Sequence, residues 1–109
     1  MTNKHNFNRE PKPRDERFAT SIVTLRNKKK KGIKAVIVTA YTYPEAVLAD
    51  RAGVDVILVG DSLGMTTLGY KTTIAVTMDD MIGHCRGVWR ANKKSFQIGD
   101  MPFMSYQES

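Results

Sequence analysis

The chain has little cysteine, no long apolar run and no apolar leader, and each scarcity narrows the class of protein. Its single cysteine, Cys85, excludes an internal disulfide framework and fits a reducing compartment such as the cytoplasm. No apolar run approaches the roughly 20 residues that span a bilayer, and the first twenty residues lack the apolar core of a signal peptide. We therefore expect a soluble, cytoplasmic protein with no membrane partner.

Acidic residues are scarce only in the first third of the chain. The 109 residues carry a net charge of +6. Residues 1–34 hold eleven basic and three acidic residues, a net of +8, whereas the following 75 residues carry a net of −2. The basic excess thus belongs to a leader rather than to a folded surface, which argues against a nucleic-acid partner.

The leader divides into an arm and a short helix. Residues 1–19 are polar, contain two prolines and show no periodicity, which predicts a mobile basic arm, followed by one domain over residues 20–109. The segment TLRNKKKKG (24–32) predicts a helix end, with Thr24 as N-cap and Gly32 just beyond the last turn. Its four lysines suit the negative end of a helix dipole; a patch for nucleic acid or an acidic partner is the alternative.

After Lys34, short apolar runs alternate with amphipathic stretches. Three runs predict strands, of which the third is weaker: AVIVTAY (35–41), VDVILVG (54–60) and SFQIG (95–99). PEAVLADRAG (44–53) and a longer segment after Thr77 predict helices, so the order is βαβαβ. Continuous rather than alternating apolar strands indicate a parallel sheet covered on both faces, and therefore an α/β fold.

The two helices carry start and stop signals. Thr42 with Glu45, and Thr77 with Asp80, have the spacing of a capping box. Gly53 is expected to end the first helix.

The second helix has an apolar face that includes Cys85 and several methionines at helical spacing. Burial tendencies favour core packing for this face over a redox or cofactor site. His84 borders the face without a second His or Cys at ligand spacing. We expect a surface or interhelix hydrogen bond for His84, with metal binding as the alternative.

Polar residues follow the strands, where ligands meet parallel α/β sheets. Gly-Asp occurs after the second and third strands, which would bring Asp61 and Asp100 to one edge. Two carboxylates suit Mg²⁺, which takes one or two of them together with waters and substrate oxygens; the alternative is that each Asp only caps its loop. The glycine-rich GDSLGMTTLGY (60–70) matches neither a dinucleotide motif nor a P-loop, but its N–H groups and the Ser62 hydroxyl could receive an anionic group.

These residues lie in motifs that resemble a known family. The segment from TAYTYPEAV to VWR (39–90), followed by DMPFMSYQ (100–107), is similar to the amino-terminal part of the ketopantoate hydroxymethyltransferase (3-methyl-2-oxobutanoate hydroxymethyltransferase) family. VGDSLGM and DMPFMSY, in this order, are its specific motifs. The resemblance implies the first three βα units of a TIM (β/α)₈ barrel, truncated. It also implies transfer of a hydroxymethyl group from 5,10-methylenetetrahydrofolate to 3-methyl-2-oxobutanoate in pantothenate biosynthesis.

The resemblance assigns roles to three residues at the strand ends. It implies that Asp61 and Asp100 bind both Mg²⁺ and the 2-oxo acid, and that Ser62 contacts this substrate. Mg²⁺ chelated by the substrate would acidify its C3 proton and stabilise the enolate that attacks the one-carbon unit. The implied partners are the 2-oxo acid, the folate co-substrate and further copies of the chain, because the family forms decamers.

Four positions depart from the family pattern. Thr42 replaces an Asp, Lys71 an acidic residue and Gly99 an Ala, and Gln97 interrupts the third strand. A full barrel needs about 250 residues, and the family's Glu general base has no counterpart before this sequence ends. We therefore expect no catalytic residue for proton abstraction and no activity from this chain alone. The alternatives are a non-catalytic remnant, a binding module that retains part of the metal site, and another Mg²⁺-dependent barrel lyase or mutase.

Overall fold

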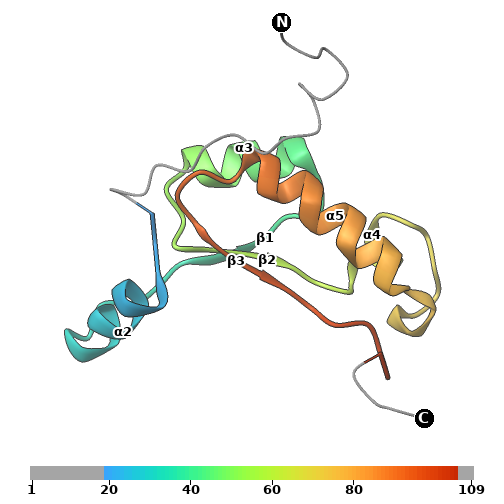
Figure 1. Ribbon diagram of the computed structural model, residues 1–109, viewed down its shortest axis with the longest axis horizontal. Coiled ribbons are helices and arrows are strands. Elements are labelled where there is room, and N and C mark those ends of the chain that lie inside the picture. The colour runs from blue at the N-terminus through green and yellow to red at the C-terminus, as the bar shows by residue number, and fades with distance from the viewer. Residues whose placement is uncertain (1–18, 106–109) are drawn as a thin grey trace, which may run out of the picture.

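The computed structural model describes residues 19–105, and they form a three-stranded parallel sheet with two long helices on one face (Figure 1). The expected arm, residues 1–19, lies outside the described residues except for Ala19. The elements in chain order are α2 (Ile22–Lys30), β1 (Ile37–Thr39), α3 (Tyr43–Arg51), β2 (Val56–Val59), α4 (Leu63–Thr66), the 3₁₀ turn η1 (Thr73–Ala75), α5 (Met78–Ala91) and β3 (Phe96–Gly99). The predicted α/β class and the βαβαβ order are confirmed.

The sheet has the strand order β1-β2-β3, with both pairs parallel. In this register Val56 of β2 lies opposite Ile37 on one side and Phe96 on the other. All three strands are shorter than their apolar runs. β1 is the shortest relative to its run, although its hydrogen bonds to β2 extend one residue beyond each end. The Val36 carbonyl accepts from Val56 N–H at 3.1 Å, and Ala40 N–H donates to the Leu58 carbonyl at 3.1 Å.

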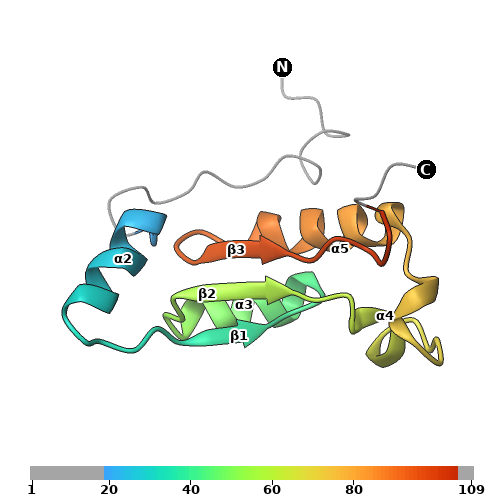
Figure 2. The same ribbon diagram turned by 90° about the horizontal axis from the view of Figure 1, so that it is seen from below.

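Helices α3 and α5 pack together on the same face of the sheet (Figure 2). The core lies between them and β2, where Ile57 and Val59 are fully buried. The helices contribute small and apolar side chains to this core: Ala46, Ala49, Met81, Val88 and Ala91. The side chains of β2 alternate between the two faces of the sheet, so every second side chain of this strand packs against the helices.

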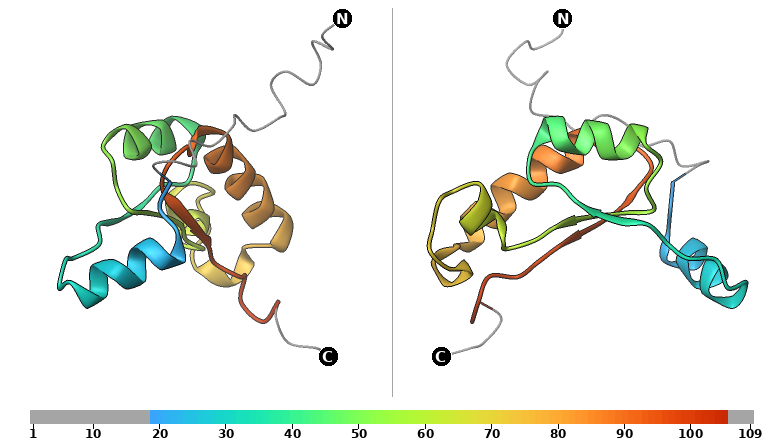
Figure 3. Two further views of the ribbon diagram at one scale, coloured as in Figure 1. Left: turned by 60° about the vertical axis from the view of Figure 1, so that its left-hand side comes forward. Right: turned by 180° about the vertical axis from the view of Figure 1, so that it is seen from behind.

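The expectation of a sheet covered on both faces is wrong for the described residues. Ile37 and Ile98 point away from the helices and are 58% and 41% exposed. No described helix covers this face, and α2 lies beyond the amino-terminal ends of the strands (Figure 3). Continuous apolar strands do indicate burial of both faces, but the two helices that connect these strands lie on one side of the sheet.

Helix α2 begins one turn earlier than predicted. Ser21, not Thr24, is the N-cap: its hydroxyl accepts from Thr24 N–H at 3.2 Å, and Thr24 Oγ1 accepts from Ser21 N–H at 3.3 Å. Thr24 therefore occupies the third helical position, because a second hydroxyl residue upstream completes the reciprocal cap. Gly32 follows the helix with φ +70°, as predicted.

A salt bridge ties α2 to the start of β2. Lys28 Nζ lies 2.7 Å from Asp55 Oδ1, and Val36 N–H donates to Asp55 Oδ2 at 2.8 Å. The hydrogen bond from Lys28, followed by that from Val36, lowers the pKa of Asp55 below its ordinary value. At least one of the four lysines thus has a partner within the fold rather than a role in an open basic patch.

The predicted caps of α3 and α5 differ in their chemistry. Thr77 and Asp80 form the expected capping box, with reciprocal hydrogen bonds of 3.1 and 3.0 Å. Thr42 is the N-cap of α3, but its hydroxyl donates to Glu45 Oε1 at 2.9 Å rather than accepting from the backbone. Gly53 follows α3 with φ +77°, as predicted.

Candidate functional site

The candidate site lies at the carboxyl edge of the sheet, where all three strands end on the side of α4 (Figure 2). The loop after β2 turns at once into α4, with Leu63 N–H donating to the Gly60 carbonyl at 3.1 Å. This turn places Asp61 and Ser62 directly beyond the sheet. The same edge receives Tyr41 after β1 and Asp100 after β3.

The structure brings Asp61 and Asp100 together. Asp61 N–H donates to Asp100 Oδ2 at 3.1 Å, while Asp100 N–H donates to the Val59 carbonyl at 3.0 Å. A Cβ added to Gly60 would lie 3.4 Å from Asp100 Oδ2 and 3.3 Å from Ser62 Oγ. Glycine at position 60 therefore lets these two polar side chains approach the loop backbone closely.

Asp100 caps the loop that follows β2, which is the alternative role that the sequence predicts for it. The hydrogen bond from Asp61 N–H, however, occupies only one of the two carboxylate oxygens of Asp100. Among residues 19–105, neither Asp100 Oδ1 nor the Asp61 carboxylate has a hydrogen bond or ion-pair partner, and no group of three His, Cys, Asp or Glu residues could hold a metal ion. Two carboxylates with available oxygens fit Mg²⁺, which usually completes its coordination with waters and substrate oxygens. Their role as metal ligands stays a prediction.

Ser62 is in contact with Tyr41, a residue that no motif in the sequence indicates. Its Oγ lies 2.7 Å from the Tyr41 hydroxyl, and either oxygen could be the donor. The signal in the sequence was the position of Tyr41, which follows the first strand just as Asp61 and Asp100 follow the other two. This position alone does not indicate a contact with Ser62.

His84 makes a hydrogen bond to the same loop. Its Nδ1 lies 2.6 Å from the Tyr41 carbonyl oxygen, which can only accept, so the ring nitrogen donates. The expected interhelix or surface bond is thus a bond from α5 to the loop between β1 and α3.

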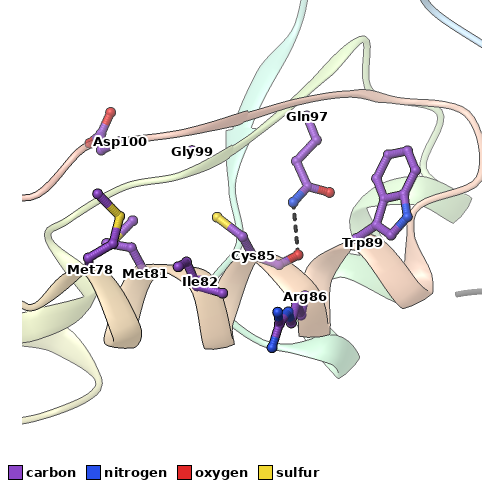
Figure 4. Close-up of a pocket in the computed structure, with 9 residues that line it drawn as sticks. All are labelled: Met78, Met81, Ile82, Cys85, Arg86, Trp89, Gln97, Gly99 and Asp100. Atoms are coloured by element: carbon purple, nitrogen blue, oxygen red, sulfur yellow. Dashed lines mark hydrogen bonds between the residues drawn. The ribbon is translucent and has the colours of Figure 1, made fainter. Parts of the chain in front are cut away.

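The apolar face of α5 is only partly in the core. Met81 and Val88 are buried, whereas Met78, Ile82 and Trp89 are more than a third exposed and border an open groove of about 360 Å³ between α5 and β3 (Figure 4). The residues that line it are Met78, Met81, Ile82, Cys85, Arg86, Trp89, Gln97, Gly99 and Asp100. Core packing, expected for the whole face, therefore holds for one half of it.

Two departures from the family pattern meet in this groove. A Cβ at Gly99 would lie 2.7 Å from Cys85 Sγ, so the thiol occupies the space that an alanine would need. Gln97 Nε2 donates to the Cys85 carbonyl at 2.9 Å, which ties β3 to α5 despite the polar side chain (Figure 4). Burial, and then the charge of Asp100, raise the pKa of the Cys85 thiol, which suits a packed side chain rather than a reactive thiolate.

None of the helices in residues 19–105 combines the length and the apolar character that crossing a bilayer requires.

A parallel sheet with acidic and hydroxyl side chains beyond neighbouring strands defines an α/β fold, a class in which ligand sites commonly lie at the carboxyl edge of the sheet. The sequence profile of the ketopantoate hydroxymethyltransferase family matches residues 19–109, and the chain belongs to this family.

Relatives in the family extend over much more sequence. The chain is 51% identical over 94 residues to a 3-methyl-2-oxobutanoate hydroxymethyltransferase of Moorella thermoacetica, a match that covers 86% of this chain and 35% of the relative. Proteins of the same name from Thermoanaerobacter sp. and Ignicoccus hospitalis are 55% identical over 89 residues and 59% identical over 90 residues, covering 82% and 80% of this chain and 32% and 34% of the relatives. The chain thus spans about a third of the length of the curated relatives it matches.

Proposed function

We propose that this chain supplies the first three βα units of a (β/α)₈ barrel that transfers a hydroxymethyl group from 5,10-methylenetetrahydrofolate to 3-methyl-2-oxobutanoate. Family membership supports the reaction. The observation that carries the site is the bond of 3.1 Å from Asp61 N–H to Asp100, since it joins two carboxylate residues at the edge where barrel enzymes bind their substrates.

The barrel assignment draws support from the two faces of the sheet. In such barrels the strands follow one another in order, helices cover the outside and side chains fill the inside. Here the order is β1-β2-β3, with α3 and α5 on one face and exposed apolar residues such as Ile37 and Ile98 on the other. The uncovered face matches the inner surface of a barrel whose other strands come from further residues.

In this proposal Asp61 and Asp100 would hold Mg²⁺ together with the 2-oxo acid. The bound ion supplies Lewis-acid stabilisation of the negative charge that develops on the 2-oxo group. Asp61 N–H fixes the orientation of the Asp100 carboxylate, and the Ser62 hydroxyl binds an oxygen of the substrate. No residue of this chain is assigned the abstraction of the C3 proton.

Family resemblance alone supports the remaining parts of the proposal. These are the folate co-substrate and a homo-oligomer of completed barrels. A cytoplasmic location also agrees with a single cysteine in the sequence.

A chimera tests the proposed function. Residues 19–109 would replace the matching segment of the Moorella thermoacetica relative, and folate-dependent formation of 2-dehydropantoate would be measured with Mg²⁺, with the unaltered relative as control. We expect turnover by the chimera and a loss of about 100-fold or more for Asp61→Asn or Asp100→Asn. A chimera that folds like the relative but shows no turnover would contradict the proposed reaction, and one that cannot fold would contradict the barrel assignment.

A further inference from the structure

Tyr41 lies in the loop between β1 and α3 and makes hydrogen bonds with three other segments. Its N–H donates to Glu45 Oε1 at 3.2 Å, its carbonyl accepts from His84 Nδ1 at 2.6 Å, and its hydroxyl lies 2.7 Å from Ser62 Oγ. The backbone of Tyr41 is thus fixed by α3 and α5, while its phenol reaches the loop after β2. Both ends of this half-buried side chain are anchored.

Ser62 is held by Tyr41 rather than by the helix that follows it. It directly precedes α4 with helical backbone angles (φ −56°, ψ −14°), and its hydroxyl makes no hydrogen bond to the first turn of that helix. Its hydroxyl instead meets the Tyr41 hydroxyl. The N–H groups of Leu63, Gly64 and Met65 donate to backbone carbonyls, so the contact with Tyr41 is the one hydrogen bond that the Ser62 hydroxyl makes among residues 19–105.

The direction of this hydrogen bond decides what Ser62 can do. A serine hydroxyl has one proton, and the carboxylate and keto oxygens of a 2-oxo acid only accept. If Ser62 donated to Tyr41, it would have no proton left for the substrate. If Tyr41 donates, the Ser62 proton remains available.

We propose that Tyr41 is a positioning residue that donates its hydroxyl proton to Ser62 and so directs the Ser62 proton toward an oxygen of the 2-oxo acid. The inference rests on the proposed role of Ser62 in substrate binding. Tyr41 fixes the Ser62 rotamer before the substrate arrives, which removes the ordering cost that a freely rotating hydroxyl would add to binding.

The test compares Tyr41→Phe with Tyr43→Phe in the chimera. Tyr43 lies two residues later and is 44% exposed, so it is a matched control for loss of a phenol hydroxyl. We expect Tyr41→Phe to raise the KM for 3-methyl-2-oxobutanoate about three- to ten-fold, with a much smaller change in kcat, and Tyr43→Phe to change neither.

Coupling to Ser62 separates positioning from general packing. In a Ser62→Ala background, Tyr41→Phe should add no further increase in KM, since the hydroxyl it orients is gone. An unchanged KM for Tyr41→Phe, or an equal further increase in the Ser62→Ala background, would overturn the proposal.

A second measurement does not depend on turnover. In the 109-residue chain with ¹³Cζ-labelled tyrosine, Ser62→Ala should move the Tyr41 signal and leave the Tyr43 signal in place. An unmoved Tyr41 signal would refute the hydrogen bond itself. An inactive chimera whose Tyr41 signal responds to Ser62→Ala would instead show that the proposed reaction, and not the contact, has failed.

Discussion

Replacing Gly64 by alanine should destabilise the loop that carries Asp61 and Ser62. Gly64 is buried in α4, and a Cβ at this position would overlap Val76 Cγ2 and lie 3.3 Å from Tyr70 Cδ2. Val76 is itself buried, and its short β-branched side chain is stiff, so the clash cannot be relieved by moving a flexible chain end.

The magnitude follows from two opposing effects. An extra methyl group in a packed interior costs about 1–3 kcal/mol, and the stiffness of Val76 favours the upper half of this range. The better helix propensity of alanine offsets at most about 1 kcal/mol. We expect a net loss of about 1–2 kcal/mol, or a fall of about 5–15 °C in the Tm of a domain of this size.

The assay is thermal unfolding of the chain, with Gly83→Ala as the matched control. Gly83 is also a helical glycine, in α5, but a Cβ there would meet nothing within 4 Å. Gly83→Ala should therefore raise the Tm. Adding Val76→Ala to Gly64→Ala should remove the penalty at position 64, because the overlapping methyl group is then absent. If Gly64→Ala raised the Tm as Gly83→Ala does, the packing argument would be refuted.

Three further predictions concern the salt bridge, the groove and the carboxylate pair. Asp55→Asn should lower the free energy of unfolding by about 0.5–1 kcal/mol at neutral pH. The folded-state pKa of Asp55 lies below its ordinary value of 3.8. The difference in unfolding free energy between the wild type and Asp55→Asn should therefore be fully present above pH 3.8 and should be lost as the pH falls through the lowered pKa. Urea unfolding across this pH range measures the difference, and a difference that persists in strong acid would count against the ion pair. Gly99→Ala should cost about 0.5–1.5 kcal/mol, because the Cys85 thiol must leave its present rotamer. Cys85→Ala should relieve that cost in a double variant, and additive losses in Tm would contradict the contact. In the chimera, Asp61→Asn and Asp100→Asn should each weaken Mg²⁺-dependent binding of the 2-oxo acid, with a double variant that loses less than the sum; calorimetric titration with and without Mg²⁺ decides, and unchanged metal-dependent affinity would leave only the capping role.

Local signals in the sequence predicted most of the fold. The capping box at Thr77 and Asp80, and the left-handed glycines Gly32 and Gly53, each depend on a few adjacent residues, and all three are confirmed. The N-cap of α2 was misplaced because Ser21 and Thr24 both have a hydroxyl that can cap. The sequence therefore allows two N-cap positions, and the structure has the one that gives the longer helix.

Features that depend on the arrangement of separate elements were harder to predict. Apolar strands showed that both faces of the sheet suit burial, but not which helices would cover them. The proximity of Asp61 and Asp100 followed from parallel neighbouring strands, whereas the contact between Tyr41 and Ser62 depends on how two loops turn beyond the sheet. The close approach of the Cys85 thiol to Gly99 could not be predicted either, because the two residues lie on different elements.

The uncovered face of the sheet has a consequence for synthesis on the ribosome. In the proposed barrel of about 250 residues, these three strands emerge first, and at about 5–20 residues per second the rest would take about 7–30 s to follow. During that interval Ile37 of β1 and Ile98 of β3 would remain exposed on the two edge strands of the sheet, whose outer backbone groups are unpaired. The nascent chain would therefore present an adhesive surface to other nascent chains and to chaperones, and the speed with which later strands arrive would determine how much of the protein escapes aggregation.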